Sequence, residues 1–223
     1  RSSDAAPVRL TLVTDDTAPA AELTEAEVSE QKAVRLEKRQ RLIDSGAGAY
    51  PVGVGVTTTI PALRAKYPEL EADATTGDIV GIAGRVVHLR NTGKLCFASL
   101  QSGDGQRIQA MISLAEVGEE SLERWKDLVD LGDHVFVSGE VISSRRGELS
   151  VLARDWAIAA KAILPLPNLH SELSDEQRVR SRYLDLIVRE QARFTVRARA
   201  AVNASLRSTF SAHEYLEVET PML

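Results

Sequence analysis

The stretch from Gly77 to Lys161 constrains the fold more than any other part of this 223-residue chain. Short apolar–polar alternations separated by turn residues predict five strands within it. We place them at Asp78–Arg90, Lys94–Gln101, Arg107–Ile112, His134–Ser143 and Leu149–Ala160, with one helical insertion, Leu114–Val129, after the third. This order is the layout of the OB-fold, a small barrel whose strand 2–3 face binds oligonucleotides. The predicted fold class is therefore a five-stranded OB-fold β-barrel.

The second and third predicted strands carry different side chains on their two faces, because successive residues of a strand point to opposite sides. One face is apolar and holds Cys96, Ala98, Leu100, Ile108, Ala110 and Ile112. The other holds Phe97, Ser99, Gln101, Arg107, Gln109 and Met111. A base can stack on an exposed ring, and an amide can read a base edge. Phe97 could equally turn inward and cap one end of the barrel, and the pattern alone leaves both interpretations open.

The charge of the chain is unevenly distributed. A net charge of −5 argues against a generally basic nucleic-acid-binding surface. Within residues 77–161, however, the insertion at 113–133 holds seven acidic residues against two basic ones, whereas the rest of the barrel holds eight basic residues against five acidic. The barrel is therefore locally positive, which suits contact with phosphate groups.

Composition excludes several kinds of site. The single cysteine, Cys96, rules out an internal disulfide framework and a cysteine-based zinc site. The four histidines show no ligand spacing, so we predict no metal site and no cofactor in this chain. No apolar run approaches the roughly 18 residues of a membrane-spanning helix, and no signal peptide is visible. Because the chain stops inside an apparent structural unit, we expect it to continue in a longer protein.

The segments on either side of the barrel read as mainly helical. A capping box at Thr24–Glu27 predicts a helix from Glu25 to Ser45, with Ala33, Leu36, Gln40 and Ile43 on one narrow stripe and basic residues elsewhere. A second capping box at Ser174–Gln177 begins a helix through Ile187, followed by a helix at Gln191–Ala212 and a strand at Leu216–Thr220. Seven arginines between Arg178 and Arg199 could bind phosphate, or could pair with acidic groups that this chain lacks.

These patterns divide the chain into five parts. We expect a disordered or linker segment at 1–23, a basic N-terminal helix and connector at 24–76, the barrel at 77–163, a proline-containing hinge at 164–174, and the helical start of a further α+β domain at 175–223.

Three stretches together resemble class II aminoacyl-tRNA synthetases of the lysine/aspartate/asparagine subgroup. They are the barrel with Gly93-Lys94, Phe97 and Ile108-Gln109, the run Arg180-Ser181-Arg182-Tyr183-Leu184-Asp185-Leu186-Ile187, and a motif-1-like end from Phe210 to Pro221-Met222-Leu223. The turns and the Pro165-Leu166-Pro167 hinge are most similar to the lysine members. One departure is Ala212-His213-Glu214-Tyr215, where the family has a glycine that can adopt a positive φ.

The resemblance implies roles for individual residues and a tRNA for lysine as the partner. Phe97 corresponds to the aromatic that stacks on the central uridine of the anticodon, Gln109 to the amide that reads this base, and Arg90 to the arginine that supports it. Glu148 corresponds to an acidic residue near another anticodon base. The N-terminal helix corresponds to one that lies against the anticodon stem. Contacts with the tRNA backbone are expected from Arg85, Lys94, Arg107, Lys32, Arg35, Lys38 and Arg39.

The family's ATP, Mg²⁺ and lysine sites lie in segments beyond Leu223. We therefore expect no catalytic residue in this chain and no lysine activation by this chain alone. We expect the parent enzyme to be cytoplasmic and to dimerise through motif 1, which includes Pro221. One alternative is the same module within a membrane-linked lysyl-phosphatidylglycerol synthase fusion, on the cytoplasmic side of the membrane. A less favoured alternative is a generic single-strand-binding OB protein.

Overall fold

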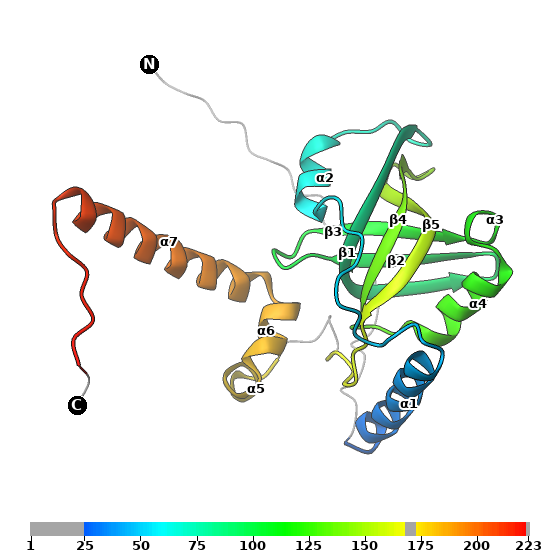
Figure 1. Ribbon diagram of the computed structural model, residues 1–223, viewed down its shortest axis with the longest axis horizontal. Coiled ribbons are helices and arrows are strands. Elements are labelled where there is room, and N and C mark those ends of the chain that lie inside the picture. Colours follow the sequence, from blue (N-terminus) through cyan, green and yellow to red (C-terminus); the bar gives the residue numbers. More distant parts are fainter. Residues whose placement is uncertain (1–24, 168–172, 222–223) are drawn as a thin grey trace.

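The computed structural model describes residues 25–167 and 173–221, as a barrel with helices on either side of it in the sequence (Figure 1). The elements are α1 (Glu25–Asp44), α2 (Ile60–Lys66), β1 (Thr75–Thr92), β2 (Leu95–Gln101), β3 (Arg107–Ser113), α3 (Leu114–Val117), α4 (Glu119–Leu128), β4 (His134–Ser143), β5 (Leu149–Ala160), α5 (Asp175–Arg180), α6 (Arg182–Val188) and α7 (Glu190–Ala212). The predicted linker at 1–23, the first capping box and Met222-Leu223 lie outside the described residues.

The five strands close into a barrel in the order β1-β2-β3-β5-β4, and this confirms the predicted fold class. Only β3 and β5 pair in parallel; the other neighbours are antiparallel. β1 is longer than predicted because its first half pairs with β4 and its second half with β2. A glycine is required at position 81, where a Cβ atom would lie 2.3 Å from the carbonyl oxygen of Gly55.

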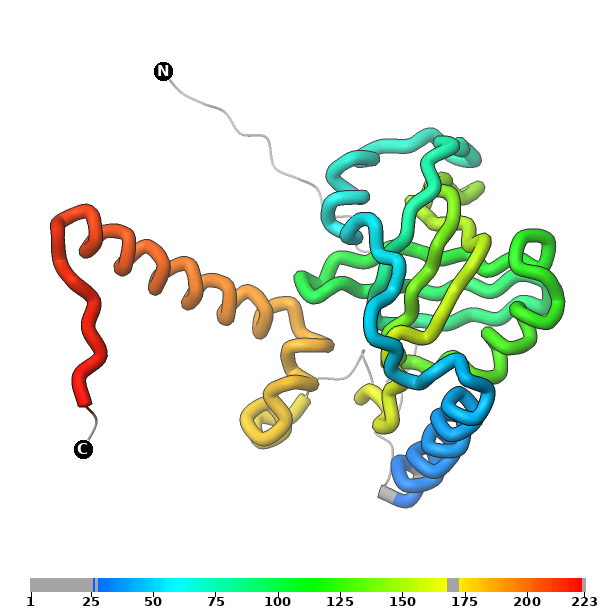
Figure 2. Tube along the Cα trace, in the orientation of Figure 1, coloured from blue at the N-terminus to red at the C-terminus, as the bar shows by residue number. Residues whose placement is uncertain are grey.

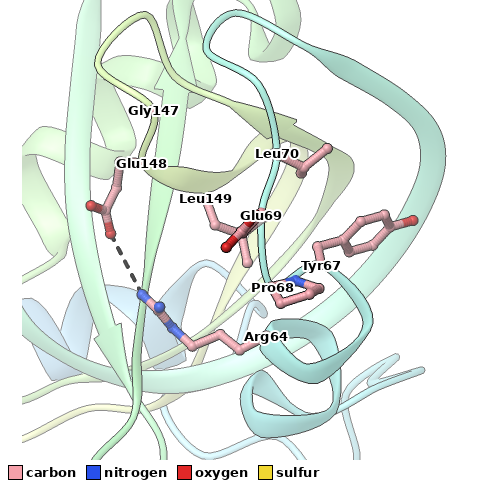
Figure 3. Close-up of a pocket in the computed structure, with 8 residues that line it drawn as sticks. All are labelled: Arg64, Tyr67, Pro68, Glu69, Leu70, Gly147, Glu148 and Leu149. Atoms are coloured by element: carbon pink, nitrogen blue, oxygen red, sulfur yellow. Dashed lines mark ion pairs between the residues drawn. The ribbon is translucent and has the colours of Figure 1, made fainter. Parts of the chain in front are cut away.

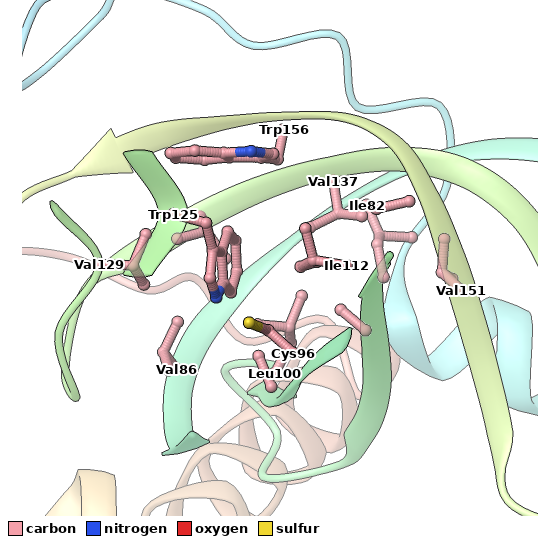
Figure 4. Packing of buried hydrophobic residues seen from close by; sticks show 14 of the residues in the cluster. Ile82, Val86, Cys96, Leu100, Ile112, Trp125, Val129, Val137, Val151 and Trp156 are labelled. Carbon is pink, nitrogen blue, oxygen red and sulfur yellow. The ribbon is translucent and has the colours of Figure 1, made fainter. Parts of the chain in front are cut away.

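The inside of the barrel is filled by the apolar faces that alternation predicts. Cys96, Leu100 and Ile112 are buried among valines and isoleucines of the other strands (Figure 4). Helix α4 adds Trp125, whose ring meets that of Trp156 edge to face at a centroid distance of 5.0 Å. The predicted helical insertion is two helices rather than one, because Gly118, at φ 80°, separates α3 from α4.

Helix α1 contacts the barrel through a face other than its narrow apolar stripe. The expected apolar stripe of Ala33, Leu36, Gln40 and Ile43 faces away, and Leu36 and Ile43 are 40% and 42% exposed. Of the apolar residues in this helix, Leu42 is the one that reaches the core. Polar contacts of this helix, which an apolar pattern does not register, lie on its other side.

Two basic residues of α1 make these polar contacts. Arg35 is 7% exposed, and its Nη1 donates to the backbone carbonyls of Leu131, Ala162 and Leu164 at 2.9, 3.3 and 3.3 Å. Lys38 pairs with Asp130 at 2.7 Å. Arg35 therefore anchors the helix to the barrel and is not exposed for the tRNA-backbone contact predicted for it.

Lys161, one of the eight basic residues that make the barrel locally positive in the sequence, is buried. Its ammonium donates to the carboxylate of Asp133 at 2.7 Å and to the carbonyl of Leu128 at 2.8 Å, and it also pairs with Asp130. Burial, the largest influence, raises the pKa of the Asp133 carboxyl. The charge on Asp133 is therefore costly without Lys161 beside it.

After the barrel, the predicted helix at Gln191–Ala212 is present as α7 (Glu190–Ala212), which projects away from the barrel (Figure 2). The expected helix from Ser174 to Ile187 is divided at Ser181 into α5 and α6, while its capping box is present. Four of the seven arginines do find acidic partners, which corrects the sequence interpretation for them: the pairs are Arg178–Asp175, Arg180–Glu176, Arg182–Asp185 and Arg189–Asp185.

The end of the described chain differs from the predicted strand. Residues 216–220 pair with none of the five described strands, and Leu216 and Val218 are 88% and 73% exposed. A strand requires a neighbour for its backbone hydrogen bonds, so the apolar alternation there does not form one. In the turn before this segment, Glu214 adopts the left-handed conformation although it is not a glycine, with φ 64°. Tyr215 N donates to Phe210 O at 3.1 Å.

The buried ion cluster generates a stability prediction. Replacing Lys161 with Met leaves the buried Asp133 carboxylate unpaired, so the free energy of unfolding should fall by about 3–5 kcal/mol. The double variant Lys161→Met/Asp133→Asn removes the stranded charge and should recover part of the loss. Urea denaturation of both variants measures the two values. Equal losses in the single and double variants would contradict this account.

Candidate nucleic-acid interface

The outer face of β1, β2 and β3 brings the predicted base-reading residues together. Arg90 lies opposite Phe97 in the β1–β2 pairing, and Phe97 lies opposite Met111 in the β2–β3 pairing. One step along, Ser99 lies opposite Gln109. Phe97 and Gln109 are therefore diagonal neighbours, whose Cα atoms are typically about 7–8 Å apart on one face of a sheet. A base stacked on the ring would have its edge within reach of the amide.

Phe97 points out of the barrel. Its neighbours Cys96 and Ala98 are buried in the core at 0% and 1% exposure, whereas Phe97 is half-buried on the opposite face. The guanidinium of Arg90 lies over the ring, 4.8 Å from its centroid, as a cation–π contact. The alternative interpretation of Phe97 as an inward cap is therefore wrong, and Arg90 steadies the ring from one side.

Gln109 is held by a neighbour that sequence reasoning missed. The parallel pairing of β3 with β5 sets Ser150 beside Gln109, and the Ser150 hydroxyl lies 3.0 Å from the amide oxygen Oε1. Ser150 is fully buried, whereas Gln109 is partly exposed. No local signal marks Ser150 in the sequence, because a parallel partner from a distant strand cannot be assigned before the strand order is known.

Glu148 lies in the β4–β5 turn beside a pocket of about 330 Å³ (Figure 3). The pocket is lined by Arg64, Tyr67, Pro68, Glu69, Leu70, Gly147, Glu148 and Leu149. Arg64 of α2 pairs with the Glu148 carboxylate at 3.5 Å and donates from Nε to the carbonyl of Arg107 on β3. Arg64, also missed in the sequence, thus connects α2, the β4–β5 turn and the edge of the candidate interface.

The residues predicted to contact the tRNA backbone have different environments. Lys32 and Lys94 are exposed, and Arg107 is exposed with Nε donating to Gln101 Oε1 at 3.2 Å. Arg85 is half-buried and donates to Gly132 O at 2.9 Å; burial lowers the pKa of its guanidinium. On α1, Lys38 is neutralised by Asp130, Arg39 lies over the ring of Tyr50 at 5.6 Å, and Arg35 is buried.

Cationic side chains at the surface near this face are therefore fewer than the sequence suggests. Arg145 and Arg146, next to Glu148 in the β4–β5 turn, are exposed and add positive charge there. Within residues 25–167 and 173–221, no group of three or more His, Cys, Asp or Glu side chains could hold a metal ion. No helix in these ranges is long and apolar enough to cross a membrane.

Comparison with known families matches both halves of the chain. Residues 66–159 match an OB-fold nucleic acid binding domain of the tRNA anticodon type, and residues 174–223 match tRNA synthetases class II (D, K and N). The chain belongs to this class II synthetase family. The resemblance inferred from the sequence is thereby confirmed.

Individual relatives indicate which members of this family the chain resembles. The chain is 58% identical over 197 residues to a lysine–tRNA ligase of Mycolicibacterium gilvum and 59% identical over 197 residues to one of Kineococcus radiotolerans. Each alignment covers 88% of this chain. It is 38% identical over 195 residues, 87% of this chain, to a lysylphosphatidylglycerol biosynthesis bifunctional protein of Mycobacterium ulcerans. The chain spans about 39% of the length of the two ligases and 17% of the bifunctional protein.

The outward position of Phe97 predicts a small effect on stability. Phe97→Ala removes a half-exposed ring and its contact with Arg90, so the free energy of unfolding should fall by about 1 kcal/mol. The matched change on the inner face of the same strand, Leu100→Ala, should cost about 2–5 kcal/mol. Thermal melts of both variants measure the difference, and a larger loss for Phe97→Ala would place its ring in the core.

Proposed function

We propose that the outer β1–β2–β3 face binds the anticodon arm of a lysine tRNA, as the anticodon-binding region of a lysyl-tRNA synthetase that charges tRNA with lysine using ATP. The observation that carries the proposal is the arrangement of Phe97 and Gln109 as diagonal neighbours on one face, each held by a second residue. Arg90 holds the ring, and Ser150 holds the amide. Both groups are thus set in place before a base arrives, which reduces the cost of ordering them on binding.

In this proposal, phosphate contacts supply affinity and base contacts supply discrimination. Lys94, Arg107, Lys32, Arg145 and Arg146 are exposed cations able to contact the phosphate backbone, which supplies sequence-independent affinity. Phe97 and Gln109 supply discrimination through stacking and hydrogen bonds. Glu148 is proposed to face a neighbouring anticodon base.

The partners of the whole protein follow the same proposal. Lysine, ATP and Mg²⁺ are proposed as ligands of the whole parent enzyme, on the similarity to lysine–tRNA ligases and to class II tRNA synthetases. A homodimer in the cytoplasm is proposed, with the segment that ends at Pro221 at its interface. In support, α7 leaves Phe194, Val202 and Phe210 between 54% and 62% exposed, as expected of a helix that packs against further structure.

A second candidate parent is a bifunctional lysylphosphatidylglycerol biosynthesis protein, which would set the same module beside a membrane. The 38% identity to the Mycobacterium ulcerans protein favours it, but identities of 58% and 59% to two lysine–tRNA ligases favour the first parent more. A generic single-strand-binding protein is the weakest candidate, because it does not account for the class II match at residues 174–223.

Base reading by Phe97 and Gln109 can be measured with anticodon stem-loop RNAs. Phe97→Ala removes the stacking surface and should cost about 1–3 kcal/mol of binding free energy. Gln109→Ala should cost a similar amount, mainly against RNA with the central uridine, because other bases never made those hydrogen bonds. Fluorescence anisotropy with RNAs that carry or lack this uridine reports both effects. Equal discrimination by wild-type and Phe97→Ala protein would contradict the assigned site.

Salt dependence distinguishes free from engaged cations on α1 and the barrel. Lys32→Ala and Lys94→Ala should each reduce the slope of log K against log salt by about 0.7–0.9, since each removes one phosphate contact. Lys38→Ala is the matched control on α1, because Asp130 already neutralises Lys38. Its slope should equal that of wild type. A slope that is reduced for Lys38→Ala but not for Lys32→Ala or Lys94→Ala would contradict the assignment of Lys32 and Lys94 as phosphate contacts and of Lys38 as already neutralised.

A further inference from the structure

Two exposed arginines, one from β3 and one from α7, bind neutral oxygens of the turn between β2 and β3. Arg107, the first residue of β3, donates from Nε to the amide oxygen of Gln101 at 3.2 Å. Arg197 of α7 donates from Nη1 to the backbone carbonyl oxygen of Asp104 at 3.3 Å. A neutral acceptor fixes the position of a guanidinium group but does not cancel its charge. Both arginines are therefore held at the turn as uncompensated cations.

A third arginine, Arg193, lies at the same turn, beside which α7 begins (Figure 2). Its guanidinium packs against Gly105, where a Cβ atom would lie 2.5 Å from Nη2, and its Nη1 donates to two backbone carbonyls at the end of α6 at 2.9 and 3.0 Å. Burial, the largest influence, lowers the pKa of the Arg193 guanidinium, and the charges of Arg107 and Arg197 lower it further. The three guanidinium groups are therefore close enough to repel one another.

Carboxylates near the turn do not neutralise this charge. Glu190 and Asp104 raise the pKa of Arg193 through space, but none of the three arginines forms an ion pair with a carboxylate within residues 25–167 and 173–221. The Asp104 carboxylate instead accepts two hydrogen bonds within the turn itself. Like charges held together without a counter-charge favour the binding of an anion.

The position of the turn indicates which anion. Arg107 and Gln109 lie on the same face of β3, two residues apart, which is about 7 Å along a strand. Every nucleotide of an RNA strand carries a phosphate. A strand whose base reaches Gln109 would therefore bring its backbone within reach of the arginines at this turn.

We propose that these three arginines, Arg107, Arg193 and Arg197, form a junction cluster that binds backbone phosphates of the RNA next to the bases read on the outer face. The planar guanidinium group matches the geometry of a phosphate, to which it can donate two parallel hydrogen bonds. Arg107 and Arg197 are exposed and would touch the phosphates, whereas Arg193 is partly buried and adds charge. The inference rests on the proposed anticodon-binding function and extends the RNA-binding surface from the barrel onto α7.

The test measures how the affinity of the whole chain for an anticodon stem-loop RNA depends on salt. Arg197→Gln removes one exposed cation, so the slope of log K against log salt should fall by about 0.7–0.9. The loss of affinity should be the same for RNAs with and without the central uridine, because phosphate contacts carry no sequence information. Arg197→Lys keeps the charge and should keep the slope of wild type.

Arg199→Gln is the matched control on the same helix. Arg199 is also exposed and has no ion pair among the described residues, but it lies about 200° around α7 from Arg197 and makes no hydrogen bond to the turn there. Its slope should equal that of wild type. An equal reduction in Arg197→Gln and Arg199→Gln would indicate a diffuse effect of charge and would overturn the cluster.

The remaining outcomes separate this inference from the proposed function. A wild-type slope in Arg197→Gln, in a protein that still prefers RNA with the central uridine, would overturn the cluster and leave the proposed function intact. A reduced slope in Arg197→Gln, with no preference for uridine in wild type, would support phosphate binding at the junction and contradict base reading by Phe97 and Gln109. A wild-type protein that binds neither RNA would overturn both.

Discussion

The ion cluster of Lys161 with Asp130 and Asp133 joins the parts of this molecule that are distant in sequence. Lys161 ends β5, the two aspartates precede β4, and Asp130 also receives Lys38 from α1. Asp133 accepts backbone N–H bonds from Asp130 and Ala162, so its carboxylate is fully bonded inside the protein. A buried charge is tolerated only when it is paired and hydrogen-bonded in this way. Lys161 therefore links the end of β5 to the segment before β4, and Asp130 connects this cluster to α1 through Lys38.

The barrel and its outer face were predictable because their signal is local and periodic. Alternation in β2 and β3 assigned Cys96 and Leu100 inward and Phe97 and Gln109 outward, and the structure places all four accordingly. The register then adds what the pattern could not contain. Arg90 is the cross-strand partner of Phe97, and Ser150 is that of Gln109. These pairings depend on which strands become neighbours. The sequence thus predicted the reading residues but only part of their support.

Failures of prediction share a physical cause: they concern segments whose structure depends on partners elsewhere. The docked face of α1 was missed because Arg35 binds backbone carbonyls, which carry no signature in the side-chain pattern. The strand at 216–220 was predicted from alternation alone, yet no described strand lies beside it. The left-handed turn at Glu214 persists without a glycine, at a cost of about 1 kcal/mol, because the hydrogen bonds that end α7 require that conformation.

The acidic insertion and the basic helix α1 contact each other through ion pairs. Asp127 pairs with Arg41 at 2.8 Å, and Asp130 pairs with Lys38 at 2.7 Å. Two of the seven acidic residues of the insertion are therefore paired with basic residues of α1, and these pairs dock the helix. Exposed cations remain on α1 at Lys32 and on the barrel, around Lys94, Arg107 and the β4–β5 turn. A net charge of −5 is thus compatible with a positive reading face, because the sum over the chain says little about where the unpaired charges lie.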